Sequence, residues 1–526
     1  MQNVYYHGKI ITMEKDALYV EAVAVKDGKI FAAGTKEDIQ NRCKDGWSWI
    51  DLQGHTMLPG LIDSHSHFSG AAIGFTQVDL GGAASFAEVK KRTDAFLNEF
   101  HPDAGTFVLA RNFEPYKPDI RENFTMEELN ELTPEYPFVI QHKSGHMGWM
   151  NDSALEKLGI TADTKVPEGG FIGKKDGRLT GYLEESAFVS HMMKIPFYSP
   201  GQMVTAALKA QEKYASYGIT TMQEGYVVNE LEQPLTEMIQ SDILKLDYVW
   251  YMPMEAWEHF CGKFPDAVSK YSGHLKLAGC KTFLDGSPQG KTAWLTQPYE
   301  GSEEKGYPAM KDEQLEKICA FCEEKGIQLL VHCNGDAACQ QYIDVYGKVY
   351  KEYQKDIRPV LIHAQMLRED QLDAVAEYHM IPSFFVSHVY HWGEIHVKNL
   401  GWERAKRISP LRSAKEKGLL FTIHTDAPVI EPDLLEAVWC AVNRMIKNGT
   451  QLGAEECVDV YDALCAVTKN AAYQYGEEKE KGTIAEGKRA DLVILDKNPL
   501  TEKKECIRKI QVLETIKDGE TIFKNS

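Results

Sequence analysis

The sequence predicts an α/β fold, in which a (β/α)8 barrel is joined to a small β-sandwich formed by both ends of the chain. Two observations lead to this prediction. In the middle of the chain, eight apolar, β-branched runs of strand length alternate with longer helical patterns, as a parallel barrel requires. At the two ends, short strand-like runs are separated by turn dipeptides instead.

The two ends share one β-rich pattern. Near the start, alternating apolar residues flank the dipeptides His7-Gly8 and Asp27-Gly28, which predict hairpin turns. The end of the chain repeats the pattern in GTIAEGKRADLVILDKN and IQVLETIKDGETIFKNS. Neither end could bury both faces of its strands alone. We therefore expect residues 1–57 and 478–526 to meet in one β-sandwich.

The barrel is expected to take residues 58–74, with strand one, and residues 200–477. Its eight candidate strands are MLPGLIDSH, GITTMQE, LDYVWYMP, LKLAGCKTFLD, QLLVHCNG, PVLIHAQ, IPSFFVSH and LLFTIHTDA. Residues 75–199 are too long for a single crossover and carry strand-like runs of their own, such as TFVLARNF. They are interpreted as an insertion after strand one that covers the barrel mouth.

Composition narrows the range of partners. The formal charge of −19 argues against nucleic acid and anionic membranes, because both attract basic surfaces. No run approaches the ~20 apolar residues of a membrane-spanning helix, and no signal peptide is seen at the start. The eleven cysteines are an odd number spread over a long chain, which favours a reducing cytoplasm over a disulfide framework.

Metal-binding side chains stand at the expected carboxyl ends of the strands, where barrel enzymes place their active sites. They are His65 and His67 on strand one, Lys281 on strand four, His332 on strand five, His363 on strand six and Asp426 on strand eight. Residues two apart in a strand point the same way, so His65 and His67 can both face the axis. Singly these signals are weak, since Asp426 could simply cap a helix. Together they predict a divalent metal site.

The chain resembles the amidohydrolase superfamily, metal-dependent hydrolases on a distorted (β/α)8 TIM barrel with an appended β-sandwich. The matching pieces are VYYHGKIITM, AVAVKDGKIFAAG, LPGLIDSHSH, KTFLDGS, VHCNGDAA, RPVLIHAQ, HTDAPV and GTIAEGKRADLVILDKNPL. Finer features resemble amidohydrolase family 3, the branch with N-substituted formamide deformylases. These are SGHMGWMNDSAL, PEGGFI, TAWLTQPY, PSFFVSH and the large insertion.

The resemblance implies a cofactor of one or two divalent ions, with Zn²⁺ expected. It implies that His65, His67, His332, His363 and Asp426 are ligands, and that Lys281 occupies the position where many members carry a lysine carboxylated by CO₂. Burial near cations would lower the pKa of Lys281 and permit that modification. The alternative for Lys281 is a salt bridge, for instance to Asp285.

The implied mechanism uses a metal-bound hydroxide as the nucleophile. Asp426 would accept the proton of the attacking water and return it to the leaving amine. His363 or a pocket side chain would help to hold the developing oxyanion.

Other residues are predicted to contact the substrate: Glu224, His388, Trp392, Phe113, His146, Trp149 and Trp294. His388 is expected to end strand seven, and a second metal cluster with His391 and His396 is the less favoured alternative. Glu224 ends strand two and could instead pair with Lys281. The aromatic residues of the insertion and of the loop after strand four could form an apolar lid or serve ordinary packing.

The sequence thus predicts an amidohydrolase that cleaves the C–N bond of a small amide, formamide or lactam-like substrate, with a homodimer as an option. The alternatives are a mononuclear deaminase on the same scaffold and a catalytically inactive binding protein. Deaminases of this superfamily tend to carry a glutamate shortly after the strand-five histidine, whereas the stretch from His332 reads HCNGDAAC. The presence of all six metal-site residues argues against an inactive protein.

Metal content distinguishes these three interpretations. Elemental analysis of the purified protein by mass spectrometry should find two divalent ions per chain for the amidohydrolase. One ion would favour the deaminase, and a chain that binds none would favour the inactive protein.

Overall fold

The computed structural model describes residues 2–195 and 200–525. The chain divides into two compact units. Unit 1 comprises Met1–Phe68, Gln211–Glu232 and Leu244–Ser526, and unit 2 comprises Ser69–Ala210 and Gln233–Ile243. The predicted insertion, residues 75–199, falls inside unit 2.

Unit 1 contains a curled sheet of eight strands that pair in parallel throughout, in the order β19-β18-β17-β16-β15-β14-β13-β6. The strands are β6 (Leu61–Ile62), β13 (Ile219–Glu224), β14 (Asp247–Met252), β15 (Leu275–Phe283), β16 (Gln328–Cys333), β17 (Val360–His363), β18 (Ile381–Phe384) and β19 (Thr422–Ile423). Each lies within one of the eight predicted runs. Neighbouring strands follow one another along the chain, which is the topology of a TIM-barrel-like α/β fold.

Along the chain, helices lie between successive strands of this sheet from β13 to β19, and further helices follow β19. Those of unit 1 are α9 (Trp257–Lys263), α10 (Asp312–Lys325), α11 (Asp336–Tyr353), α12 (Leu372–Glu377), α13 (His388–Leu400), α14 (Trp402–Ala405), α15 (Leu411–Glu416), α16 (Leu434–Asn443), α17 (Val460–Ala466) and α18 (Lys469–Gln474). Helices α7 (Pro200–Ser216) and α8 (Glu232–Gln240) span the boundaries between the units. All eleven cysteines are unpaired, as expected without a disulfide framework.

The predicted strand one is split between two sheets. Its first part, β5 (Thr56–Pro59), pairs with strands of the chain ends, and β6 belongs to the barrel. Gly60 lies between them, and a Cβ there would come within 2.4 Å of the Thr220 side chain. The absence of a side chain at this position lets the chain pass closely beside β13 as it changes sheets.

The first and last barrel strands are joined just beyond their ends. The Asp63 carboxylate accepts hydrogen bonds from the backbone N–H of Thr425 at 3.2 Å and from its hydroxyl at 2.5 Å. The Asp426 N–H donates to the His65 carbonyl at 3.0 Å, and the His67 N–H donates to the Ala427 carbonyl at 2.7 Å. These bonds hold the carboxyl end of strand one against that of strand eight.

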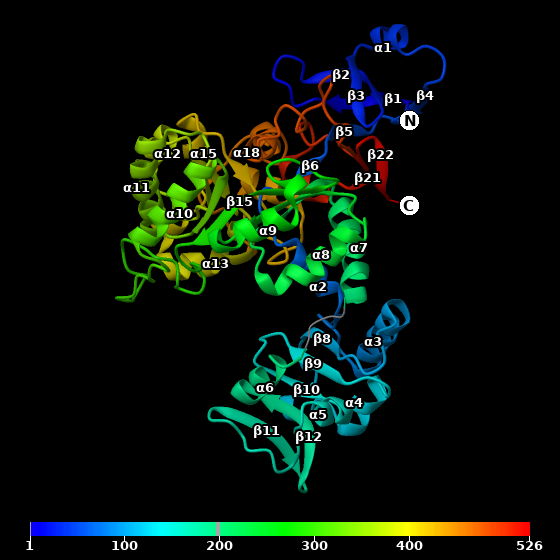
Figure 1. Cartoon of the computed structure of the whole chain (residues 1–526), viewed down its shortest axis with the longest axis vertical. Coiled ribbons are helices and arrows are strands. Elements are labelled where there is room, and N and C mark those ends of the chain that lie inside the picture. Colours follow the sequence, from blue (N-terminus) through cyan, green and yellow to red (C-terminus); the bar gives the residue numbers. More distant parts are fainter. Residues whose placement is uncertain (1, 196–199, 526) are drawn as a thin grey trace. The chain divides into compact units, whose positions relative to one another are not determined.

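Strands from both chain ends form one further sheet, with the path β22-β21-β20-β5-β1-β2-β3 and β4 paired to β1. They are β1 (Gln2–Ile11), β2 (Tyr19–Lys26), β3 (Lys29–Gly34), β4 (Ser48–Asp51), β20 (Leu492–Leu495), β21 (Val512–Lys517) and β22 (Glu520–Lys524), and α1 (Lys36–Arg42) follows β3. Figure 1 shows the blue N-terminal strands beside the red C-terminal ones. The two ends of the chain therefore meet, as predicted, while the two layers of a sandwich stay a prediction.

The two turn dipeptides have different outcomes. Asp27-Gly28 forms the predicted hairpin between β2 and β3, with φ angles of 49° and 79°. The hairpin predicted at His7-Gly8 is wrong, because β1 runs through this dipeptide with a register shift. There β1 changes its parallel partner from β4 to β5, so the dipeptide marks a bulge.

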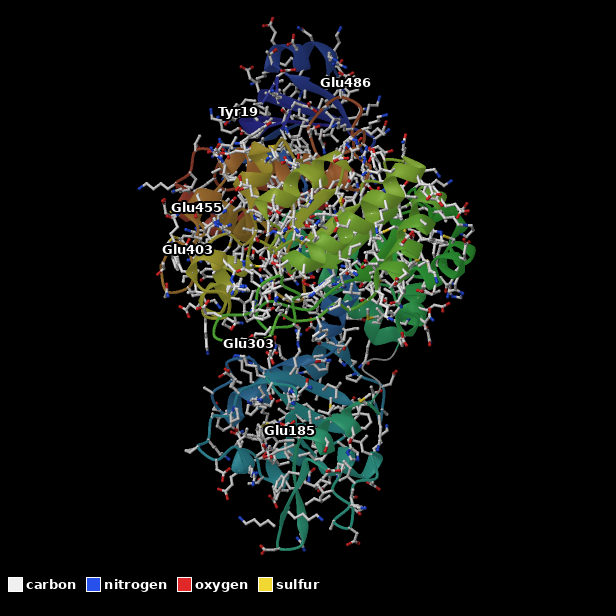
Figure 2. The ribbon with its side chains drawn as sticks, turned by 90° about the vertical axis from the view of Figure 1, so that its left-hand side faces the viewer. Tyr19, Glu185, Glu303, Glu403, Glu455 and Glu486 are labelled. Atoms are coloured by element: carbon white, nitrogen blue, oxygen red, sulfur yellow. The ribbon has the colours of Figure 1, made fainter. Side chains whose placement is uncertain are left out.

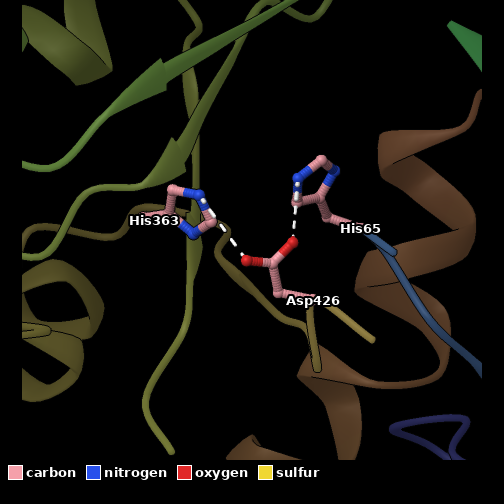
Figure 3. Close-up of side chains that lie close together, drawn as sticks. All are labelled: His65, His363 and Asp426. Carbon is pink, nitrogen blue, oxygen red and sulfur yellow. Dashed lines mark ion pairs between the residues drawn. The ribbon is translucent and has the colours of Figure 1, made fainter. Parts of the chain in front are cut away.

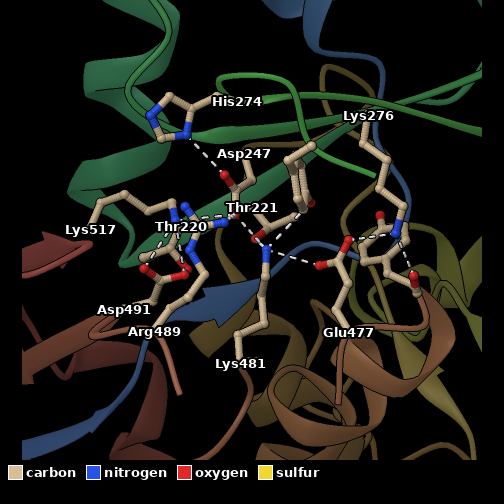
Figure 4. Close-up of polar contacts among 12 residues, drawn as sticks. Thr220, Thr221, Asp247, His274, Lys276, Glu477, Lys481, Arg489, Asp491 and Lys517 are labelled. Carbon is tan, nitrogen blue, oxygen red and sulfur yellow. Dashed lines mark hydrogen bonds and ion pairs between the residues drawn. The ribbon is translucent and has the colours of Figure 1, made fainter. Parts of the chain in front are cut away.

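A buried ion network links the terminal sheet to the amino ends of the barrel strands (Figure 4). The fully buried Asp247 lies 2.5 Å from the Lys481 ammonium, 3.1 Å from Arg489 and 3.1 Å from Lys517. The Lys481 ammonium also contacts Glu477 at 2.9 Å. Although burial opposes its charge, the neighbouring lysines hold the pKa of Asp247 well below its usual value.

Unit 2 has its own six-stranded sheet, in the order β11-β12-β10-β9-β8-β7. The strands are β7 (Val78–Asp79), β8 (Val108–Phe113), β9 (Phe138–His142), β10 (Met147–Met150), β11 (Gly170–Lys175) and β12 (Arg178–Glu184). The helices are α2 (Phe68–Phe75), α3 (Phe86–Phe100), α4 (Met126–Leu132), α5 (Asp152–Lys157) and α6 (Glu185–Met192). Its core contains a cluster of aromatic rings, with the Phe113 ring 5.1 Å from Phe124 and 5.3 Å from Trp149.

Exposed acidic side chains occur on both units. Glu403, Glu455 and Glu486 are exposed on unit 1, and Glu185 is exposed on unit 2 (Figure 2). Among the described residues, no helix is both long enough and apolar enough to cross a membrane.

Replacing Asp247 with Asn should destabilise the protein strongly, because three cations would lose their shared buried carboxylate. Breaking a buried pair in this way costs about 3–5 kcal/mol. Urea denaturation followed by circular dichroism measures the change. Asp373→Asn is the matched control, since Asp373 pairs with Lys417 on the surface. Equal midpoints for both variants would contradict a stabilising role for the network.

Candidate metal centre

Three side chains from three strand ends converge on one point (Figure 3). A ligand atom of His65, one of His363 and one of Asp426 all lie within 4.8 Å of one another. The Nε2 atom of His65 is 3.6 Å from Asp426 Oδ1, and that of His363 is 4.0 Å from Asp426 Oδ2. Two imidazoles and a carboxylate at this spacing form a donor set that divalent transition metals accept.

The other predicted ligands lie beside this group. The Nε2 atom of His67 is 3.5 Å from Asp426 Oδ1, and the Lys281 ammonium is 3.4 Å from His65 Nε2. The His332 ring centroid is 4.7 Å from that of His363. All six side chains predicted from the sequence are thus connected by close contacts at one end of the barrel.

A buried oxygen in this group has no protein donor. Asp426 Oδ1 is inaccessible to solvent and accepts no hydrogen bond from any described residue. A buried, unpaired carboxylate oxygen is costly unless a cation or another donor compensates it. The residues present therefore fit a divalent ion, which would supply this compensation.

Gln223 orients His65 for such a role. The Gln223 amide nitrogen donates to the Ser64 carbonyl at 2.9 Å and to the Tyr475 hydroxyl at 2.8 Å. Its oxygen therefore faces His65 Nδ1, at 2.6 Å, and accepts that N–H. This tautomer, assigned from the hydrogen-bond network, leaves a lone pair on Nε2, the atom that faces Asp426.

Besides Gln223, two further supporting residues have roles that were not predicted from the sequence. His424 is fully buried, with Nε2 3.1 Å from His363 Nδ1 and Nδ1 2.8 Å from the Ser383 hydroxyl. The sequence held a signal for it, because His424 stands two residues before Asp426 in the run predicted as strand eight, although β19 itself ends at Ile423.

The second such residue is Asp285, just after strand four. Its carboxylate accepts the N–H groups of Asn334 at 2.9 Å and Gly335 at 2.7 Å, and lies 3.3 Å from His332 Nδ1. No ion pair joins Asp285 to Lys281 among the described residues, so the salt bridge considered for Lys281 is wrong. Asp285 instead holds the turn after His332.

Burial sets the charge states at this centre. It lowers the pKa values of His65 and His363 well below the usual one, so both rings stay neutral and keep a lone pair. It lowers the pKa of Lys281 to about 7, against the opposing attraction of Asp426. Burial also raises the pKa of Asp426, although His67 and Lys281 oppose the rise. Because of this lowered pKa, Lys281 can be neutral near pH 7, and carboxylation requires a neutral amine.

The backbone is strained where the ligands sit. His363 and Asp426 have φ angles of 73° and 55°, in the left-handed region that costs a side chain on the order of 1–3 kcal/mol. At Gly225, a Cβ would lie 2.6 Å from the His65 ring and 3.0 Å from the His67 ring. Glycine is required here so that both imidazoles fit beside the end of β13.

Two residues of unit 1 that were predicted to contact the substrate, Glu224 and Trp294, lie beside residues of the metal centre or its support. Glu224 accepts the Tyr248 hydroxyl at 2.8 Å and lies 3.8 Å from His67 Nδ1, so His67, not Lys281, is its close contact at the metal centre. Trp294 is half-buried, and its backbone N–H donates to the Asp285 carboxylate at 3.0 Å.

The placement of His388 at the end of strand seven is wrong, because β18 ends at Phe384 and His388 begins α13. Its ring centroid lies 4.6 Å from those of Phe385 and Trp392, and its Nδ1 lies 3.1 Å from His396 Nε2. The described residues contain no second group of metal ligands, so the alternative cluster is not formed.

The aromatic residues predicted as substrate contacts in unit 2 serve its core. Phe113 and Trp149 are completely buried, and the Trp149 ring also packs against Tyr182. Substrate contact by these two side chains is therefore a wrong prediction, because their own sheet needs them as packing. His146 is exposed and lies 3.0 Å from the Glu185 carboxylate.

Comparison with known proteins agrees with the fold and with the predicted family. Residues 48–523 match the model of the amidohydrolase family. The N-substituted formamide deformylase of Arthrobacter pascens is 27% identical over 95% of this chain and 94% of its own. An uncharacterized metal-dependent hydrolase from Pyrococcus furiosus superposes with a TM-score of 0.75, at 22% identity over 95% of this chain and all of the other. An adenosine deaminase from Xanthomonas campestris with bound zinc gives a TM-score of 0.54, at 14% identity over 99% and 92%.

The protein is thus a metal-dependent hydrolase on a TIM-barrel-like scaffold. The chain belongs to the amidohydrolase family and is an enzyme that hydrolyses carbon–nitrogen bonds.

Replacing Gln223 with Met should weaken metal binding, because the partner that fixes the His65 tautomer would be lost. Changes of this kind cost roughly 10–100-fold in metal affinity. Competition with a chromogenic chelator measures the affinity. Gln211→Met is the matched control, since Gln211 is also a buried glutamine but binds the Lys245 N–H. An unchanged affinity in Gln223→Met would contradict the assigned role.

Proposed function

We propose that this enzyme hydrolyses the amide bond of a small, uncharged N-substituted amide or formamide. The observation that carries the proposal is the buried Asp426 carboxylate, whose Oδ1 has no protein hydrogen-bond donor. Its Oδ1 lies 3.6 Å from His65 and its Oδ2 lies 4.0 Å from His363, and both histidines are neutral. A carboxylate in this position can take up a proton within reach of the reacting atoms and release it again.

His65, His67, His332, His363 and Asp426 are the proposed ligands. A divalent ion held by them would polarise the amide carbonyl and acidify a water molecule. Asp426 takes the proton from the attacking water and delivers it to the leaving nitrogen, so that an amine departs as the carboxylic acid forms.

Aromatic rings close to the metal centre support an apolar substrate. The Phe283 ring lies 4.8 Å from Tyr226 and 5.4 Å from His332, and the rings of Phe385 and Trp392 flank His388. Aromatic surfaces favour an aryl or alkyl substituent on the amide nitrogen. The polar His388 and Trp392 side chains are proposed to contact the substrate there. The resemblance to an N-substituted formamide deformylase supports the same class.

The finer features of the enzyme are proposals of the same kind. We propose zinc as the ion, a second ion bridged through a carboxylated Lys281, a two-layered terminal domain and a cytoplasmic location. The homodimer, the substrate contacts of Glu224, His146 and Trp294, and the covering of the barrel mouth by the insertion also stay predictions. The pKa of about 7 at Lys281 supports its modification.

A product assay tests the proposal and distinguishes it from deamination. Zinc-loaded protein is incubated with N-benzylformamide, N-benzylacetamide, a lactam and two amino-substituted heterocycles. We expect benzylamine and formate from the formamide, and no ammonia from the heterocycles. Ammonia from a heterocycle without amide cleavage would instead establish the deaminase.

Asp426→Asn should reduce this turnover by about 10²–10⁴-fold, because Asn cannot carry the proton. Its metal content is measured in the same samples and should largely remain. Asp344→Asn, which removes an exposed carboxylate from α11, is the matched control and should keep full activity. Full activity in Asp426→Asn would disprove the proton-transfer role.

A further inference from the structure

A separate cavity in unit 1 has no role in the mechanism above. Its volume is about 290 Å³, close to the lower end of the range of small-molecule sites, which begins near ~300 Å³. None of the six proposed metal-centre residues lines it. Its walls come from the loop after β15, the start of α11, the segment after β17, and helices α14 and α15.

The cavity combines an apolar wall with arginines. Leu295, Met366 and Pro410 contribute apolar surface, and Arg404 and Arg407 contribute guanidinium groups. Such a combination suits an amphipathic anion, whose apolar body packs on the wall while its charged group meets the planar donors of arginine.

The cavity lining contains four carboxylates, Asp336, Glu369, Asp370 and Glu456, and all except Glu369 have strong partners other than Arg404 and Arg407. Asp336 and Asp370 both pair with Arg368, at 3.0 and 2.9 Å. Asp336 also accepts the hydroxyl of Thr296. The Glu456 carboxylate accepts the N–H of Ser413 at 3.0 Å and its hydroxyl at 2.6 Å. These three acids therefore do not pair with Arg404 or Arg407, and only Glu369 contacts one of them, Arg407.

Arg404 keeps its charge uncompensated. Its Nε donates to the Leu400 carbonyl at 2.7 Å and its Nη1 to the Gln297 carbonyl at 3.4 Å, which are neutral acceptors. Within the described part of the chain, no carboxylate lies within 4.0 Å of this guanidinium. Arg407 has only an exposed contact with Glu369 at 3.9 Å, a weak type of pair.

We propose that this cavity is an accessory binding site for a small organic carboxylate with an apolar body, held by Arg404 and Arg407. The carboxylate accepts N–H groups of both guanidiniums, and the apolar body packs on Leu295, Met366 and Pro410. The residues of this cavity take no part in the proposed hydrolysis. The proposal therefore does not rest on the amide substrate proposed above.

Isothermal titration calorimetry with phenylacetate tests this proposal on the full-length protein. We expect one binding site per chain and no comparable binding of the neutral 2-phenylethanol. Arg404→Gln should bind phenylacetate with an affinity at least about tenfold lower than that of the unchanged protein. Arg412→Gln is the matched control, because Arg412 pairs with Glu416 on the surface and does not line the cavity. The control should bind phenylacetate like the unchanged protein.

A carboxylate could also bind a metal ion directly, so each titration is repeated after removal of metal with a chelator. Binding that survives chelation and is weakened by Arg404→Gln supports the cavity. Binding that disappears on chelation and is unaffected by Arg404→Gln would place phenylacetate at the metal centre and overturn the proposal. Failure of the unchanged protein to bind phenylacetate would overturn it as well.

Discussion

The metal centre depends on the hydrogen bonds that join the first and last barrel strands. The backbone bond from Asp426 to the His65 carbonyl brings the two side chains together, although 360 positions separate them in the sequence. The hydrogen bonds from Thr425 to the Asp63 carboxylate hold the same two strands together, just before His65 and Asp426 in the chain. Without this closure, the carboxylate of strand eight would not face the imidazoles of strand one.

Burial then makes these side chains useful as ligands. Removal from water disfavours the charged forms of His65 and His363, so their lone pairs stay available. The same desolvation raises the pKa of Asp426 and leaves one of its oxygens without a donor. A divalent ion would supply the missing partner of that oxygen and accept the lone pairs of the two histidines.

Stability and chemistry are placed at opposite ends of the barrel. The ion network around Asp247 lies where β14 begins, and the candidate ligands lie where strands end or just beyond. In barrels of this kind, the amino-terminal face serves stability and the carboxyl-terminal face serves catalysis. The terminal sheet is anchored to the first of these faces by Lys481, Arg489 and Lys517.

The sequence by itself determined the eight barrel strands, the meeting of the two chain ends and the six candidate ligands. These features depend on local periodicity and on residue types at strand ends, which are readable along the chain. Only the tertiary structure decided which partners support the ligands. Gln223, Asp285 and His424 are ordinary polar residues in the sequence, and their roles follow from neighbours brought in by other strands.

The wrong predictions have the same origin. Phe113 and Trp149 are aromatic residues in an insertion, and the sequence cannot tell a pocket wall from a hydrophobic core. His7-Gly8 has the composition of a turn, yet β1 needs it as a bulge to change partners. Side-chain burial and strand pairing are set by long-range contacts, so local sequence fixes neither of them.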